Sequence, residues 1–365
     1  MELSPIDVSP RELQAYERLV AHEVDALVVT SPTNIRWLTG FAGSNATVVV
    51  FDNEVTLFTD NRYADRAPAE LAGAGSSAQV GIASTELGDE VQDLLGSAEL
   101  VALEADYVSW AQHQTINDEW LPAQTLVPTS GLIDRLRSRK DTAEIERIEA
   151  AAAIVDESLA QVRPLLGQRR TERDFARSLD AAIRSNGADD LGFDTIVASG
   201  PNGAIPHHSP GDRIIKPGDF VIVDVGAMVQ GYRSDMTRTF SVGSMSPEQR
   251  RHYDTVIAAQ QAGVDSMLAD AGTVEVDTAA RAVIDQAGWA DSFLHGTGHG
   301  VGLDIHELPR VGKGVTDVYE IGTVATVEPG VYLRGVGGVR IEDTCVVTET
   351  GARRLTKFPK DNPEV

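Results

Sequence analysis

Two aspartates lie in a segment that alternates between apolar runs and a polar turn. Asp224 and Asp235 flank the turn of residues 220–240, and the β-rich runs on either side indicate a hairpin. A turn centred on Val229 and Gln230 would place the two carboxylates directly opposite each other, with Cβ atoms roughly 5 Å apart. Like charges at that distance repel, so the arrangement favours a cation between them, and two divalent ions about 3.5–4 Å apart would fit. The alternative is a solvated hairpin with ordinary surface charges.

A second carboxylate pair follows further along the chain. Glu328 and Glu342 flank a glycine-rich turn centred on Gly335, so they too can face each other, although Pro329 makes the pairing less regular. Between the two pairs, His299 lies among glycines, which let the backbone approach a site closely. Four carboxylates and one imidazole suit a hard or borderline divalent ion such as manganese, cobalt, iron or zinc.

In order, spacing and context, these five residues resemble the metal ligands of the pita-bread metallopeptidases. The matching segments are Val223-Asp224-Val-Gly, Ser-Asp235-Met-Thr-Arg-Thr, Gly-His299-Gly-Val-Gly, Val-Glu328-Pro-Gly and Arg340-Ile-Glu342-Asp-Thr. Within that family the chain is most similar to the Xaa-Pro enzymes, prolidase and aminopeptidase P, and the resemblance covers nearly the whole chain. It implies two divalent ions per subunit, with manganese the first choice and cobalt, zinc or iron the alternatives.

The resemblance also implies a role for each ligand. Asp224 would bind one ion, His299 and Glu328 the other, and Asp235 and Glu342 both. A hydroxide held between the ions would attack the scissile carbonyl, because water bound to divalent ions loses a proton far more easily than bulk water does. Glu328 would carry that proton toward the leaving nitrogen.

Four further residues are candidates on the same resemblance. His207, in a Gly/Pro-rich loop where a surface histidine without a role is the alternative, would contact the substrate near the metals. His306 would stabilise the oxyanion of the transition state. Arg310 resembles the prolidase arginine that binds the C-terminal carboxylate of a dipeptide, for which a bidentate guanidinium is suited. Arg340 would project to the same face of its strand as Glu342 and bind substrate in members of both specificities.

The remaining histidines carry weaker signals. His295 could support the site or pack in the core. His22, His113 and His252 occur in polar helical stretches, and we expect them at the surface.

The sequence therefore predicts an enzyme that hydrolyses the Xaa-Pro bond of a small peptide with proline at its second position. Arg310 favours an Xaa-Pro dipeptidase, or prolidase, and the alternative is aminopeptidase P acting on longer peptides. Metal-free creatinase-like C–N hydrolysis and a non-catalytic binding role are remote alternatives, because such proteins lack intact ligand sets and this chain keeps all five residues. A homodimer is the assembly that the resemblance implies.

The elements that must position these residues fall into two segments. A chain of 365 residues is long enough for two domains, and we expect an α/β (α+β) fold. In residues 1–136, strand runs at 26–30, 47–50 and 55–58 alternate with helical patterns, which predicts a small mixed sheet with covering helices. This segment resembles the N-terminal domain of creatinase and prolidase, and residues 137–365 would form the pita-bread catalytic domain.

One order of elements occurs twice in residues 137–365. Helical patterns at 143–166 and 171–185 precede the aspartate hairpin. Helical patterns from Pro247 to about Ala269 and over 277–287 precede His299 and the glutamate hairpin. The repetition predicts two pseudo-symmetric halves that meet at a central metal site.

Charge and composition exclude several classes of partner. A formal net charge of −24 opposes binding to nucleic acids and to anionic membranes. No apolar run approaches the length of about 18 residues that a membrane span needs, and the first residues lack the pattern of a signal peptide. We therefore expect a cytoplasmic protein, with the single cysteine, Cys345, buried as a thiol.

Overall fold

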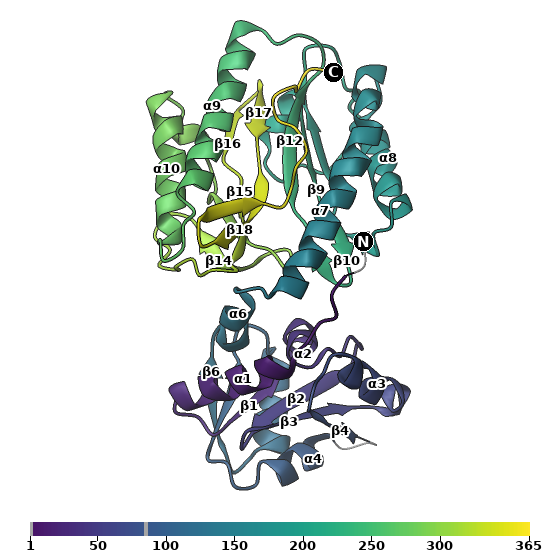
Figure 1. Ribbon diagram of the computed structural model, residues 1–365, viewed down its shortest axis with the longest axis vertical. Helices are drawn as coiled ribbons and strands as arrows, with labels where there is room; N and C mark the ends of the chain where they lie inside the picture. The colour runs from purple at the N-terminus through teal and green to yellow at the C-terminus, as the bar shows by residue number, and fades with distance from the viewer. Residues whose placement is uncertain (1–2, 84–86) are drawn as a thin grey trace. The chain divides into compact units, whose positions relative to one another are not determined.

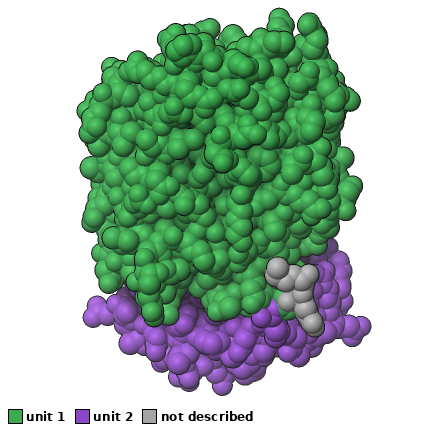
Figure 2. All heavy atoms as spheres, turned by 45° about the horizontal axis from the view of Figure 1, so that its top comes forward, with its two compact units in different colours: residues 1–3, 138–365 green, residues 4–137 purple. Residues whose placement is uncertain are grey.

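Residues 4–137 form a mixed sheet with covering helices, and they are one of the two units into which the chain divides (Figures 1 and 2). The computed structural model describes residues 3–83 and 87–365. The strands of this unit pair in the order β4-β3-β2-β1-β5-β6. Their bounds are β1 (Ala26–Val29), β2 (Ala46–Phe51), β3 (Glu54–Thr59), β4 (Gln79–Ile82), β5 (Leu100–Glu104) and β6 (Thr125–Thr129). The helices are α1 (Ser9–Ala21), α2 (Pro32–Thr39), α3 (Arg66–Gly73), α4 (Leu87–Leu94), α5 (Trp110–Thr115) and α6 (Leu132–Arg137), with short helical turns η1 (Asn61–Tyr63) and η2 (Ile116–Trp120).

The strand pattern of this unit follows from its turns and its apolar runs. β2 and β3 are antiparallel, and the turn between them holds Asp52 and Asn53 at positive φ, as is typical of a tight hairpin. β1 is buried along its whole length and pairs with β5 in parallel, as expected for a continuous apolar run. The mixed sheet with covering helices is therefore confirmed.

Residues 138–365 form the second unit. Its helices are α7 (Thr142–Val162), α8 (Glu172–Ser185), α9 (Pro247–Asp265) and α10 (Thr273–Gln286), with short turns η3 (Arg163–Gln168), η4 (Gly200–Ala204) and η5 (Ala290–Ser292). Its strands are β7 (Asp190–Leu191), β8 (Ile196–Ser199), β9 (Phe220–Val225), β10 (Ala227–Val229), β11 (Tyr232–Arg233), β12 (Met236–Ser241), β13 (Gly298–Gly300), β14 (Glu307–Val311), β15 (Val324–Val327), β16 (Gly330–Leu333), β17 (Gly337–Arg340), β18 (Asp343–Thr348) and β19 (Gly351–Arg354). They pair in the orders β11-β10-β7, β12-β9-β8, β14-β13-β15-β18-β19 and β16-β17.

Each half of this unit packs two helices against its own strands, and the strands lie between the two helix pairs (Figure 1). α7 and α8 share a core with β8, β9, β10 and β12 that includes Val155, Phe175 and Val223. In the second half, α9 and α10 pack on β14, β15 and β18 through residues such as Val264 and Val327. The order of two helices followed by ligand-bearing strands therefore occurs twice, as predicted.

Helix bounds in the second half differ from the predicted ones. α9 begins at Pro247 as predicted, after a capping box of Ser246 and Gln249, but it ends at Asp265 rather than at about residue 269. Asp270, beyond its end, adopts a positive φ, and its backbone N–H donates to the Tyr319 carbonyl. α10 begins at Thr273 rather than at residue 277. Its first turn is closed by the Glu275 carboxylate, which accepts from the backbone N–H of Gly272 at 3.2 Å. A glycine in the N-cap position gave no signal in the sequence.

The aspartate hairpin has a different register from the predicted one. Its turn lies at Gln230 and Gly231, both with positive φ as in a type I′ turn, and Asp224 pairs with Thr237. The predicted direct opposition of Asp224 and Asp235 is therefore wrong by two residues. Because side chains alternate with a period of two, the shift keeps both carboxylates on one face of the hairpin.

The glutamate hairpin has the predicted register. Gly330 pairs with Arg340 in β16–β17, and Val327 pairs with Asp343 in β15–β18. Residues 328 and 342 therefore lie opposite each other between these two pairs.

Three further predictions concern burial. Cys345 is a buried free thiol, as expected. His22 is exposed and His113 is partly buried. The prediction that His252 lies at the surface is wrong, because its side chain is buried between Phe220 and Trp289 and its Nε2 donates to the Val331 carbonyl at 3.1 Å. In the described part of the chain, no helix combines the length and apolarity that a membrane crossing requires.

The burial of His252 predicts acid sensitivity. Burial lowers the pKa of this imidazole from 6.5 to about 4, so between these values the unfolded chain binds a proton that the folded chain does not. Stability must then fall as the pH drops from 6.5 to 4, by up to about 3 kcal/mol from this group. We expect His252→Gln to flatten the dependence of the unfolding free energy on pH in this window, measured by denaturant titration. His22→Gln, which removes an exposed histidine, is the control, and equal slopes for wild type and His252→Gln would contradict the assignment.

Candidate active site

The five predicted ligands come together at the ends of strands from both halves. Asp224 lies in β9 and Asp235 immediately precedes β12, whereas His299 lies in β13. Glu328 follows β15, and Glu342 precedes β18. All five line one cavity of about 650 Å³.

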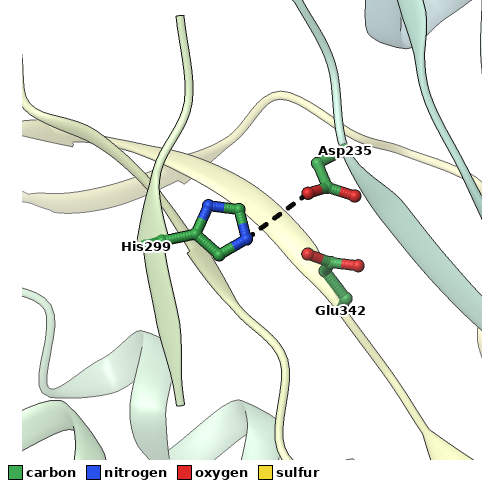
Figure 3. Close-up of side chains that lie close together, drawn as sticks. All are labelled: Asp235, His299 and Glu342. Atoms are coloured by element: carbon green, nitrogen blue, oxygen red, sulfur yellow. Dashed lines mark ion pairs between the residues drawn. The ribbon is translucent and has the colours of Figure 1, made fainter. Parts of the chain in front are cut away.

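Three of these side chains form a tight cluster in the cavity (Figure 3). Asp235, His299 and Glu342 each offer a ligand atom, and these atoms all lie within 4.8 Å of one another. His299 Nε2 is 3.6 Å from Asp235 Oδ2 and 3.2 Å from Glu328 Oε1. Because His299 Nδ1 donates to the Gly300 carbonyl at 3.0 Å, its Nε2 is the nitrogen that a metal ion would use.

Two carboxylate oxygens in the cavity have no hydrogen-bond partner among the described residues. They are Asp224 Oδ1 and Glu342 Oε1, and both are buried. Their second oxygens are held, since Arg340 Nη2 donates to Asp224 Oδ2 at 2.7 Å and Thr237 Oγ1 donates to Glu342 Oε2 at 2.7 Å. Buried acceptors are nearly always satisfied, so the two unpaired oxygens fit a donor set for cations.

The carboxylates of the cavity disturb one another's protonation. Burial raises the pKa of Asp235 well above its usual range, and the Glu342 charge raises it further. Burial likewise raises the pKa of Glu342, together with the charges of Glu328 and Asp224. Bound divalent cations would reverse this effect and keep both groups ionised. The residues present therefore fit two divalent ions of the kind that accept oxygen and imidazole ligands.

Glu328 differs from the other acidic residues of the cavity. Burial alone would raise its pKa, but the hydrogen bond and the charge of His299 lower the pKa of Glu328 to about 2. This carboxylate is therefore ionised throughout the neutral range.

Arg340 is buried in the cavity wall and is committed to protein partners. Besides Asp224, its guanidinium donates to the Tyr332 hydroxyl at 2.9 Å, to Thr237 Oγ1 at 3.1 Å and to the Pro206 carbonyl at 3.3 Å. These contacts hold the guanidinium against the carboxylate, so Arg340 fixes the orientation of Asp224.

Tyr332 extends this network to His295. The Nδ1 of His295 donates to the Gly296 carbonyl at 2.7 Å, so Nε2 must accept, and the Tyr332 hydroxyl donates to it at 2.8 Å. The tyrosine oxygen is then free to accept from Arg340. His295 thus supports the site through Tyr332 and Arg340. Burial lowers the pKa of His295, so its imidazole stays neutral.

The other predicted residues line the same cavity. His207 and Arg310 are exposed residues of its lining, and Arg310 lies directly opposite His299 in the β13–β14 pairing. The His306 ring packs edge-on against the His299 ring, with centroids 4.4 Å apart. Burial and the neighbouring His299 lower the pKa of His306. The structure therefore brings all nine predicted side chains to one cavity.

Helix α10 anchors the segment that carries His295. Arg281 Nε donates to Asp277 Oδ2 at 2.8 Å, its Nη1 donates to the Phe293 carbonyl at 3.3 Å, and its Nη2 donates to the His295 carbonyl. The same guanidinium lies 4.1 Å from the centroid of the Phe293 ring. Arg281 therefore fixes both the backbone and a ring of this segment.

Asp277 links the same helix to Glu328. Its Oδ1 accepts from Thr297 Oγ1 at 2.7 Å, and the Thr297 carbonyl accepts from the Glu328 backbone N–H at 2.8 Å.

Sequence reasoning missed Asp277, Arg281, Thr237 and Tyr332. Of these four, Thr237 could have been found from the sequence, because the correct register of the aspartate hairpin pairs it with Asp224.

The chain is similar to known metallopeptidases over almost its full length. Residues 146–349 match metallopeptidase family M24, and residues 11–139 match the creatinase/prolidase N-terminal domain. An Xaa-Pro dipeptidase of Pyrococcus furiosus is 33% identical over 341 residues, which cover 93% of this chain and 95% of the relative. The solved structure of an Xaa-Pro dipeptidase from Bacillus anthracis matches with a TM-score of 0.93 and 31% identity, covering 98% of this chain and 100% of that one. An X-Pro aminopeptidase from Thermotoga maritima matches with a TM-score of 0.85 and 29% identity, covering 96% and 100%.

The contacts of Arg281 predict an effect on metal binding. Arg281→Met removes the donors to the Phe293 and His295 carbonyls and the ion pair that holds Asp277, so the backbone that leads to His299 gains freedom. We expect affinity for Mn²⁺, measured by calorimetric titration, to fall by about tenfold or more, as is typical for residues that support metal ligands. Arg251→Met is a matched control, because Arg251 on α9 also donates to a carbonyl and stacks on an aromatic ring, Trp289, without reaching the cavity. Equal Mn²⁺ affinities for the two variants would refute this role.

Proposed function

Because the chain belongs to metallopeptidase family M24, we propose that it is a metal-dependent Xaa-Pro dipeptidase. The observation that carries the proposal is the convergence of four carboxylates and one imidazole on one cavity, with two buried carboxylate oxygens left unpaired among the described residues. The similar proteins named Xaa-Pro dipeptidase from two organisms support the substrate class.

We assign the metal ions to the five predicted ligands. Asp224, Asp235, His299, Glu328 and Glu342 would hold two divalent ions, which activate water and polarise the scissile carbonyl when bound. Manganese is our first choice, with cobalt, zinc or iron as alternatives, because carboxylate and imidazole donors accept all four. We also propose a homodimer, which the resemblance to Xaa-Pro enzymes implies.

The residues around the ligands divide the remaining chemistry. Glu328, ionised at neutral pH, takes the proton of the attacking water and delivers it to the leaving nitrogen. His306, beside His299, donates a hydrogen bond to the oxygen on which negative charge develops. His207 binds the substrate at the rim of the cavity.

The substrate's proline requires recognition by shape. The proline nitrogen of the scissile bond belongs to a tertiary amide and has no N–H to donate, so a hydrogen bond cannot identify it. Apolar side chains of the cavity, including Phe193, Ile196 and Ile305, offer a surface for the ring. The position of Arg310 opposite His299 supports its proposed role, in which it would pair with the carboxylate of the proline residue in a dipeptide.

Aminopeptidase P activity on longer peptides is the second candidate. The X-Pro aminopeptidase of Thermotoga maritima shares the fold of this chain, and the lining of the cavity includes Lys313 as well as Arg310.

The first test is hydrolysis of Ala-Pro by metal-stripped protein before and after addition of Mn²⁺, Co²⁺ or Zn²⁺. We expect cleavage only with metal, because the proposed nucleophile depends on the ions. Ala-Ala, which lacks the proline ring, is the control for specificity. The absence of Ala-Pro cleavage with every metal would refute the proposed function.

A second prediction concerns the cluster of Asp235, His299 and Glu342. Asp235→Ala or Glu342→Ala removes a carboxylate that we assign to both ions, so bound metal and turnover should be lost together. We expect kcat/KM for Ala-Pro to fall by more than about 100-fold, beyond the range typical of supporting residues, with metal content measured by mass spectrometry. Asp254→Ala, which removes an exposed carboxylate on α9, is the control. Near-normal turnover at wild-type metal content in either ligand variant would show that the assignment is wrong.

A further inference from the structure

Two cations that line the cavity have side chains without a partner among the described residues. In the part of the chain that the structure describes, neither the Arg310 guanidinium nor the Lys313 ammonium makes a hydrogen bond or an ion pair. The other two arginines of the cavity lining are committed, Arg340 to Asp224 and Arg281 to Asp277. The chain has 55 acidic and only 31 basic residues, so anionic partners are abundant. Two unpaired cations in one cavity therefore point to an anionic group of the ligand.

The two cations lie on different elements of the cavity lining. Arg310 pairs with His299 across β13 and β14, which places it beside the metal ligands. Lys313 follows three residues later in the turn of residues 312–315, where the Val315 N–H donates to the Gly312 carbonyl at 3.4 Å. Arg310 therefore lies on β14, and Lys313 lies on the turn that follows this strand.

Lys313 also borders a second hollow beside α10. This hollow of about 440 Å³ shares Arg281, Phe293 and Lys313 with the active-site cavity. Its other lining residues come mainly from one face of α10: Val274, Asp277, Thr278, Ala282, Ile284 and Asp285, together with Ala290. Arg281 and Phe293 contact each other, and Arg281 is bound to Asp277 of α10. These two side chains therefore hold a fixed position in the lining that the two spaces share. Lys313 belongs to the same shared lining.

We propose that Lys313 binds the C-terminal carboxylate of a peptide one residue longer than a dipeptide, and that the hollow beside α10 receives the side chain of that last residue. This rests on the proposed function, in which Arg310 binds the carboxylate of a dipeptide. An extended peptide advances roughly 3.3 Å per residue, so one further residue moves the carboxylate from Arg310 outward. A lysine suits this position, since its flexible stem lets a compact charge follow carboxylates of different residues.

The test compares three peptides: Ala-Pro, Ala-Pro-Ala and the C-terminal amide of Ala-Pro-Ala. Lys313→Met removes the charge and keeps the apolar stem. With the metal-loaded enzyme we expect kcat/KM for Ala-Pro-Ala to fall by about tenfold, the size of one charge-assisted hydrogen bond. Values for Ala-Pro and for the amide should stay unchanged, and Lys313→Arg should retain activity on Ala-Pro-Ala. Lys216→Met removes an exposed lysine outside the cavity and is the control.

Several outcomes would overturn the proposal. Lys313→Met could lower kcat/KM for the acid and the amide equally, or change neither. The wild-type enzyme could also cleave the amide as well as the acid, or cleave Ala-Pro but not Ala-Pro-Ala. A further variant, Ala282→Phe, fills the hollow beside α10 and should slow Ala-Pro-Ala while sparing Ala-Pro. If Ala282→Phe lowers activity on both peptides to the same extent, the hollow does not receive the side chain of the last residue.

A binding measurement separates this proposal from the proposed function. Calorimetric titration of the metal-stripped full-length chain with Ala-Pro-Ala and with its amide reads out carboxylate recognition without any cleavage. If no Xaa-Pro peptide is hydrolysed but wild type prefers the acid and Lys313→Met does not, the function fails and the role of Lys313 stands. If wild type binds acid and amide equally, the role of Lys313 fails whatever the activity.

Discussion

Repulsion among four carboxylates in one buried cavity is the constraint on which the site depends. Burial raises the pKa values of Asp235 and Glu342 and so favours their neutral forms. The charges of the neighbouring carboxylates raise these pKa values further. Ion pairs with Arg340 and His299 offset only part of this rise, and apolar residues of similar volume would be at least as stable in such a place. The cluster therefore makes physical sense as a preformed set of ligands that becomes fully ionised when divalent cations supply the missing charge.

The backbone around the cluster is built to hold these ligands despite their repulsion. β13 lies so close to β15 that a Cβ atom on Gly298 would come within 2.1 Å of the Thr326 carbonyl oxygen. This close approach places His299 against the carboxylates, while Asp277 and Arg281 of α10 secure the segment that leads into β13. The helices thus do more than cover the sheet, since one of them fixes the backbone on which a ligand depends.

Hairpin spacing predicted the two carboxylate pairs, the resemblance to the pita-bread metallopeptidases supplied the remaining site residues, and the long-range contacts were not predictable. The glutamate hairpin followed from the spacing of Glu328 and Glu342 around Gly335, whereas the aspartate hairpin was misplaced because the turn uses Gly231. The predicted register was wrong by two residues, which is one full period of side-chain alternation in a strand. Both carboxylates therefore still lie on one face of the hairpin. Arg281 and Tyr332 could not be found in the same way, because their partners are distant in sequence and no periodicity marks such contacts. His252 was expected at the surface from its charged neighbours, yet it lies on the buried side of α9.

The distribution of charge in the cavity also carries information about the ligand. Carboxylates gather at the end formed by β9, β12 and β18, while Arg310 and Lys313 lie on β14 and the turn that follows it, unpaired among the described residues. A short peptide is itself a zwitterion, with an ammonium group at one end and a carboxylate at the other. Complementary potentials of this kind set orientation and partner choice more than they set affinity. We propose that a peptide therefore binds in one direction, with its N-terminal residue near the carboxylates and its C-terminus near Arg310 and Lys313. In this proposal these two cations, rather than the chemistry at the carboxylates, decide how long the peptide can be.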